Sequence, residues 1–113
     1  MVVYTVLATI QTSMSGMEHV QMNPSRMGHV LMSQFSVMES NLHMFGAGAF
    51  TYMAILAESH CAIQTYPELN RVFVSLEYHE NDQTRPHIDA EVVIQQLAQV
   101  FDGSVLNRMT VIR

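Results

Sequence analysis

Apolar and polar residues alternate along most of this chain, with the two-residue period that is typical of β-strands. The first such segment is rich in β-branched and apolar residues, and we expect it to be buried on both faces. Short turns rich in glycine, proline and asparagine separate several of the others. The pattern predicts five strands, over residues 2–10, 50–57, 60–66, 71–78 and 105–112.

Two segments follow the helical period instead, with apolar residues three and four positions apart. One begins at Asn23–Pro24, where we expect Asn23 to be the N-cap and Pro24 the first helical residue. The other covers residues 88–101 and follows a polar loop at 80–85 and Pro86, with Gly103 expected at its C-cap. Residues 11–22 remain ambiguous, because two serines and a glycine weaken any helix there.

The order of these elements is strand, helix, several antiparallel strands, helix, strand. Both helices must cover the same face of the sheet to bury their apolar stripes, so we predict an α+β fold, a two-layer α/β sandwich with an antiparallel sheet and two helices on one face. At 113 residues the chain is expected to form a single domain, residues 1–113. The other sheet face is partly apolar, which favours contact with a second copy and hence a homo-oligomer.

Charge and composition limit the partners and the cellular compartment that we expect for this protein. Five basic residues face ten acidic ones, for a net charge of −5, which argues against nucleic acid or an anionic membrane surface as a partner and favours a small cationic ligand. No apolar run is long enough for a membrane span, and the amino-terminal segment lacks the basic start of a signal peptide. A single cysteine, Cys61, fits a reducing compartment, so we expect a cytoplasmic protein.

The absence of lysine excludes two large classes of enzyme. Pyridoxal-phosphate enzymes hold their cofactor through a lysine Schiff base, and a P-loop also requires lysine. Any electron sink must therefore be a cofactor that is not covalently bound to the protein, or be made from the chain itself. We expect no metal, because the six histidines and one cysteine show no recognised ligand spacing.

One stretch carries a distinctive motif: Glu58-Ser59-His60, then Ile63-Gln64-Thr65, Tyr66 and Pro67-Glu68. It resembles the self-processing segment of the prokaryotic pyruvoyl-dependent S-adenosylmethionine (AdoMet) decarboxylases, which carry Glu-Ser-His, Ile-His-Thr, an aromatic residue and Pro-Glu. The resemblance implies that Ser59 is the precursor of a pyruvoyl cofactor. Cleavage after Glu58 would then divide the chain into residues 1–58 and 59–113. The resemblance also implies a strand over residues 35–45, where the helical pattern alone would continue to Glu39.

The chain departs from that family at two positions. Gln64 replaces the histidine that serves the family as the base in self-processing, and a neutral amide cannot accept a proton at neutral pH. His60 and His79 are the candidates to replace that base. His79 also stands where the family has its proton-donating cysteine, twenty residues after the serine, and an imidazole can donate a proton near neutrality.

Substrate-binding positions agree better with the family. Phe45 matches an aromatic residue that stacks on adenine, and Glu68 matches an acid that accepts the ribose hydroxyl groups. Thr51 occupies the place of a small hydroxyl residue near the substrate, and the ring of Tyr66 is suited to the sulfonium. The resemblance thus predicts AdoMet as the substrate.

The sequence therefore predicts an AdoMet decarboxylase-like enzyme of polyamine (spermidine) biosynthesis that uses a self-generated pyruvoyl group. Two alternatives remain open. The chain can instead be an uncleaved AdoMet-binding enzyme, such as a phage-type lyase that releases methylthioadenosine, in which case Glu68, Glu77, Tyr66 and Tyr78 are the candidate residues. It can also be an inactive subunit that regulates an active partner.

Overall fold

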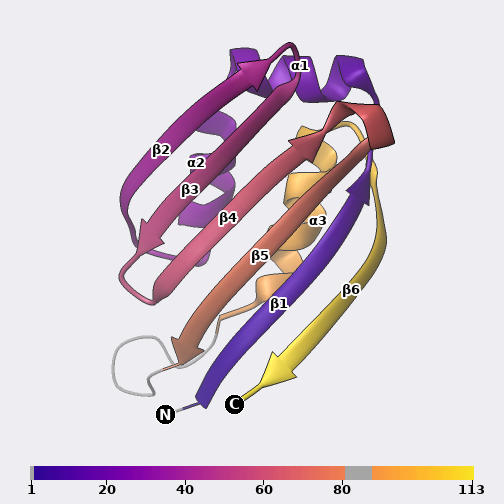
Figure 1. Cartoon of the computed structure of the whole chain (residues 1–113). Coiled ribbons are helices and arrows are strands. Elements are labelled where there is room, and N and C mark those ends of the chain that lie inside the picture. Colours follow the sequence, from indigo (N-terminus) through magenta and orange to yellow (C-terminus); the bar gives the residue numbers. More distant parts are fainter. Residues whose placement is uncertain (1, 81–87) are drawn as a thin grey trace.

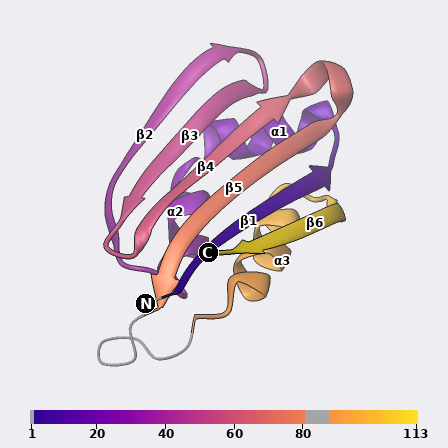
Figure 2. The ribbon, with the colours of Figure 1, turned by 60° about the horizontal axis from the view of Figure 1, so that its bottom comes forward.

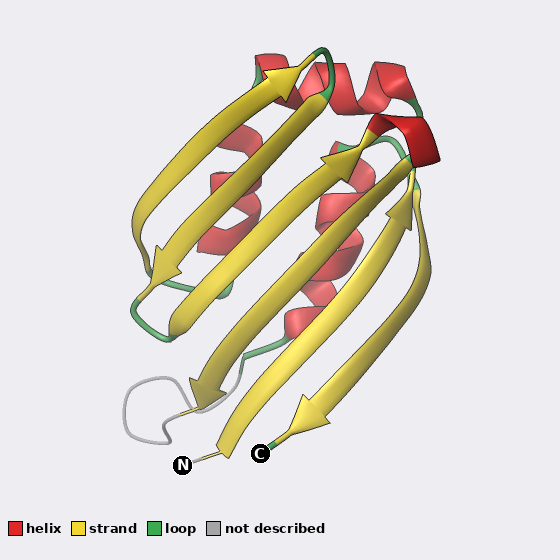
Figure 3. Cartoon of the chain, viewed as in Figure 1, coloured by secondary structure: helices red, strands yellow, loops and turns green. Residues whose placement is uncertain are grey.

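The computed structural model describes residues 2–80 and 88–113 and has the predicted two layers, a six-stranded antiparallel sheet and a layer of helices (Figures 1 and 3). The sheet has the strand order β2-β3-β4-β5-β1-β6. The predicted polar loop at 80–85 and Pro86 lie almost wholly outside the described residues. The elements are β1 (Val2–Gln11), α1 (Met14–Met22), α2 (Ser25–Met32), β2 (Val37–Gly46), β3 (Ala49–Leu56), β4 (Ser59–Tyr66), the 3-10 helix η1 (Pro67–Leu69), β5 (Arg71–Glu80), α3 (Ala90–Val100) and β6 (Ser104–Ile112).

The helices α1, α2 and α3 all lie on one face of the sheet, and no helix of the described residues covers the opposite face (Figures 1 and 2). The buried side chains form one apolar core between the two layers. Because side chains alternate along a strand, about every second residue of the four inner strands enters this core, as in β4, where Cys61, Ile63 and Thr65 are buried. The side chains between them point to the uncovered side, which we call the open face. The edge strands β2 and β6 have no buried residue.

The ambiguous stretch at 11–22 contains the helix α1. The Ser13 side chain caps it by accepting a hydrogen bond from the backbone N–H of Gly16, and Met17 and Val20 are buried. Gly16 is required for packing rather than for flexibility, because a Cβ there would overlap the carbonyl oxygen of Phe101 and the hydroxyl of Thr12. The residue that weakens the helix in isolation thus allows it to pack.

Two predicted caps are wrong. Asn23 ends α1 instead of starting the next helix, because its backbone N–H donates to the carbonyls of His19 and Val20. The N-cap of α2 is Pro24, which offers no side-chain hydrogen bond. The C-cap of α3 is Phe101 rather than Gly103. Asp102 then takes the left-handed conformation, with φ 53°, and Gly103 donates its N–H to the carbonyl of Ala98 at 2.8 Å.

The open face carries rows of side chains that run across the strands, since directly opposite residues on paired strands share a face. One row contains His43, Thr51, Gln64, Phe73, Thr9 and Asn107. The next contains Asn41, Met53, Ala62, Ser75, Leu7 and Met109. The third contains Glu39, Ile55, His60, Glu77, Thr5 and Val111.

In the described part of the chain, no helix combines the length and the hydropathy that crossing a membrane would require.

Candidate active site

The Glu58–Ser59 peptide bond lies in the tight turn between β3 and β4. The turn is tied to the residues before β2, because Ser36 donates its N–H to the Glu58 carboxylate at 3.0 Å and accepts from the Ala57 N–H at 2.8 Å. Ser59 has φ 156°, a positive value that residues with a side chain rarely adopt. The bond predicted to break is therefore held in a strained conformation.

Two histidines adjoin this bond. The Ser59 hydroxyl lies 3.1 Å from Nδ1 of His60, and the Glu58 carbonyl accepts a hydrogen bond from the backbone N–H of His79 at 3.2 Å. His60 can thus take the hydroxyl proton, and the His79 N–H can stabilise negative charge that develops on the Glu58 oxygen. The turn thus has a ring nitrogen beside the Ser59 hydroxyl and a backbone N–H on the carbonyl that this hydroxyl would attack.

Pairing of β4 with β5 explains why His79 reaches the turn. Ser59 lies opposite Tyr78, so the next residue along β5, His79, continues the ladder beside Glu58. The sequence analysis placed Ser59, Glu58, His60 and His79 in one site, and the structure brings all four to the same end of the sheet.

Gln64 lies at the other end of β4. It is five residues from Ser59, which at about 3.3 Å per residue in a strand amounts to about 17 Å. Its side-chain amide donates to the Thr51 hydroxyl at 3.2 Å and accepts from the Tyr66 hydroxyl at 3.4 Å. Within one chain, residue 64 is therefore too far from Ser59 to take part in its processing, whatever its side chain.

The predicted binding residues share this second end. Thr51 and Tyr66 contact Gln64, and the Tyr66 ring packs edge-on against Phe73 with 5.1 Å between centroids. Phe45 is 69% exposed and lies 4.6 Å from the ring of His43, so its face is available to a flat ligand. Glu68 is exposed in η1. The structure thus separates the residues predicted to bind the substrate from those predicted to take part in processing.

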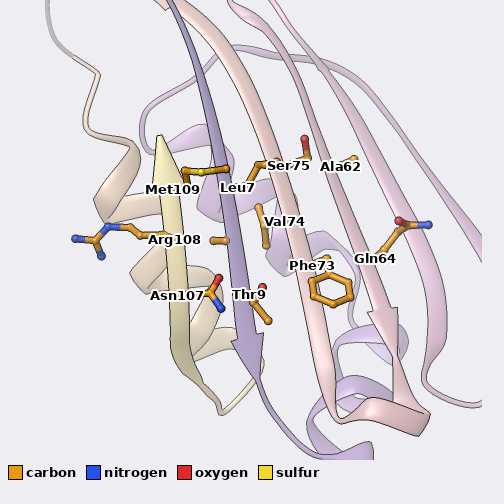
Figure 4. A pocket seen from close by; sticks show the side chains of 11 residues that line it. Leu7, Thr9, Ala62, Gln64, Phe73, Val74, Ser75, Asn107, Arg108 and Met109 are labelled. Carbon is orange, nitrogen blue, oxygen red and sulfur yellow. The ribbon is translucent and has the colours of Figure 1, made fainter. Parts of the chain in front are cut away.

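A shallow hollow of about 580 Å³ lies on the part of the open face that β4, β5, β1 and β6 form (Figure 4). Of the predicted site residues, only Gln64 lines it. Arg108 contributes to its rim but pairs with Glu91 of α3 at 2.5 Å. The remaining lining residues come from four strands: Leu7, Ala8, Thr9, Ala62, Phe73, Val74, Ser75, Asn107 and Met109.

The sequence analysis did not single out these lining residues. Period-two alternation already assigns Leu7 and Thr9, and likewise Phe73 and Ser75, to one face of their strands. The missing information is which strands are neighbours, because β1 pairs with β5 and β6, which are far from it in sequence.

Cys61 takes no part in this site. It is fully buried in the core, and burial raises the pKa of its thiol to about 12. Among the described residues, no group of three or more His, Cys, Asp or Glu side chains is arranged to hold a metal ion.

Comparison with known proteins agrees with the motif and the fold. A family model described as S-adenosylmethionine decarboxylase matches residues 21–113. The fold is similar to the crystal structure of the adenosylmethionine decarboxylase from Aquifex aeolicus, with a TM-score of 0.73 and 14% identity over 99% of this chain and 88% of that one. No curated protein matches the sequence. Because the family model covers most of its length, this chain belongs to the S-adenosylmethionine decarboxylase family.

Proposed function

We propose that the protein is a cytoplasmic AdoMet decarboxylase-like enzyme of polyamine (spermidine) biosynthesis that makes its pyruvoyl group from Ser59. The observation that carries the proposal is the strained Glu58–Ser59 turn, with His60 on the hydroxyl and the His79 N–H on the carbonyl. A serine at an ordinary strand end needs none of these three features.

Processing starts when the Ser59 hydroxyl attacks the Glu58 carbonyl carbon. A C–O ester bond forms, the C–N amide bond breaks, and the hydroxyl proton passes through His60 to the new amine. Loss of the Cα proton of Ser59 then breaks its Cβ–O bond, which releases Glu58 as a carboxylate and leaves dehydroalanine. Water replaces the nitrogen, ammonia departs, and a pyruvoyl group remains at residue 59.

The base for the Cα proton cannot be Gln64 of the same chain, on grounds of chemistry and distance. We assign this role to His79, because its backbone is hydrogen-bonded to the carbonyl of the bond that breaks. A pyruvoyl ketone at position 59 would supply the electron sink that lysine-bound cofactors supply elsewhere. The surroundings fit such a group, since His60, His79 and Glu77 can position a substrate amine and exchange protons beside it.

The separation of the two ends favours a homodimer that joins open faces. A two-fold axis near the row of Ala62 and Ser75 would place the Gln64 end of one copy over the Ser59 end of the other. Apolar side chains exposed on this face, including Leu7, Met53 and Ile55, would be buried in the contact. AdoMet would then bind to Phe45, Thr51, Tyr66 and Glu68 of one copy and reach residue 59 of the other.

Intact-mass analysis of the purified protein tests the proposal. We expect two polypeptides, residues 1–58 and 59–113, the second reactive toward hydrazine reagents, and carbon dioxide release from carboxyl-labelled AdoMet. The Ser59→Ala variant is the control and should remain one chain. A wild-type chain that stays whole and inert to hydrazine would overturn the proposal.

The Gln64→His variant tests the dimer. An imidazole at position 64 should accelerate cleavage only if the partner copy brings it to Ser59, because the distance within one chain is about 17 Å. We therefore expect faster cleavage in this variant, and slower cleavage after dilution below the dissociation constant. Cleavage that is unaffected by both changes would argue against a site shared between copies.

Gln64 itself favours a second candidate function, an AdoMet lyase that is never cleaved. Positioning and desolvation alone can let the substrate carboxylate displace methylthioadenosine, without a pyruvoyl group. An uncut chain that releases methylthioadenosine from AdoMet would establish this function. Binding without turnover would instead indicate a regulatory subunit.

A further inference from the structure

The turn between β2 and β3 is held by a side chain from outside the sheet. Gln21, near the end of α1, donates its side-chain N–H to the Gly46 carbonyl at 2.7 Å and accepts from the Gly48 N–H at 2.9 Å. The helix lies beside this turn (Figure 1). One planar amide thus uses its donor and its acceptor on two residues of the same turn, which fixes the orientation of the turn as well as its position.

Two further contacts keep this turn in place. Gly48 is buried with φ 72°, and a Cβ added there would lie 2.8 Å from Sδ of Met14, so α1 packs directly against the turn. From the other side, the buried Thr65 hydroxyl donates to the Gly48 carbonyl at 2.5 Å and accepts from the Phe50 N–H at 2.9 Å. The turn is therefore held between α1 and β4.

Phe45 precedes this turn as the extra residue of a β-bulge. The pairing of β2 with β3 shifts register between Met44 and Gly46, so Phe45 is left without an opposite residue on β3. A bulge redirects the side chain that it carries, and the new direction depends on the backbone on either side of it. The exposed Phe45 ring lies against the ring of His43 on the open face. Its direction is thus set where Gln21 holds the Gly46 carbonyl.

We propose that Gln21 is a positioning residue for the substrate, which acts by fixing the bulge so that the Phe45 ring is directed at the adenine of AdoMet. The inference rests on the substrate proposed above. An aromatic ring whose orientation is fixed before binding loses less conformational freedom when it stacks on a purine. Gln21 therefore contributes to purine affinity through Phe45, in addition to any contribution to the stability of the fold.

Isothermal titration calorimetry with methylthioadenosine, which keeps the adenine of AdoMet, measures this contribution. The titrations use Ser59→Ala protein, which stays whole. Gln21→Met keeps the length and helix propensity of the side chain but removes both hydrogen bonds. Gln99→Met is the matched control, because it makes the same change at an exposed position on α3. We expect Gln21→Met to raise the dissociation constant roughly two- to tenfold and Gln99→Met to leave it unchanged.

The same pair of substitutions in Phe45→Leu protein separates positioning from a general loss of structure. Without the aromatic ring, Gln21→Met should change the dissociation constant by less than about twofold, because the group through which it acts is gone. Equal affinity in the Gln21→Met and Gln99→Met proteins overturns the inference. Equal weakening with and without the Phe45 ring also overturns it, since the effect would then not pass through that ring.

The outcome for Gln21 is distinguishable from the outcome for cleavage. A wild-type chain that stays whole but binds methylthioadenosine with this dependence on Gln21 would refute the pyruvoyl function and support the inference. A chain that is cleaved at Ser59 but whose purine affinity is indifferent to Gln21→Met would do the reverse. Absence of methylthioadenosine binding by the Ser59→Ala protein overturns the inference outright.

Discussion

Replacing Ser59 with glycine rather than alanine should stabilise the folded protein, because only glycine adopts φ 156° without strain. A residue held in such a conformation costs about 1–3 kcal/mol. Part of this gain is offset, because glycine raises the conformational entropy of the unfolded chain, which costs about 0.4–1 kcal/mol of stability. We expect Ser59→Gly to exceed Ser59→Ala in free energy of unfolding by about 0.5–2 kcal/mol, which corresponds to a higher Tm by roughly 2–8 °C in a domain of this size.

Urea unfolding followed by circular dichroism measures the difference directly. Both variants lack the hydroxyl and remain uncleaved, so the comparison isolates the backbone. Ser75 in the middle of β5 is the matched control, because it has no positive φ and glycine there should be less stable than alanine. If glycine is also the less stable residue at position 59, the turn is unstrained, and strain cannot contribute to breaking the Glu58–Ser59 bond.

Three further predictions concern the core and its ionisable groups. Gly16→Ala should destabilise the fold by about 1–3 kcal/mol in urea, because its Cβ overlaps the Phe101 carbonyl, whereas Gly46→Ala meets nothing and should be nearly neutral. Burial raises the pKa of Tyr78 to about 12, so the unfolded phenol ionises first and stability should fall as pH rises from 10 to 12. Tyr78→Phe should remove that part of the alkaline loss. With its thiol pKa raised to about 12, Cys61 should react with a disulfide reagent at pH 8 roughly a thousandfold more slowly than in unfolded protein.

The local hydrophobic pattern was sufficient to predict a strand or helix wherever that element is stabilised by its own sequence. The alternation in residues 50–57 and 71–78 predicted β3 and β5, and the helical period in 88–101 predicted α3. The helix α1 was not predicted, because its stability comes from burying Met17 and Val20 and from the close packing of Gly16 against the Phe101 carbonyl. Neither is a local property of the sequence.

The same distinction applies to the candidate site, where residues close in sequence were predicted and contacts across the sheet were not. Adjacent residues Glu58, Ser59 and His60 carry a recognisable motif, and the spacing to His79 was also readable from the chain. The sequence did not reveal that Gln64 lies at the far end of the strand, or that Glu77 stands opposite His60 in the pairing of β4 with β5.

The sequence by itself determined the family and the exclusion of lysine-based chemistry, and it pointed to Ser59 as the proposed nucleophile, because these depend on which residues are present and on short spacings. Only the tertiary structure decided which side chains meet. Strand order brings β1, β5 and β6 together from distant parts of the chain, and pairing register then sets which residues stand opposite each other. Register depends on the packing of the whole sheet against its helices, which no short stretch of sequence encodes.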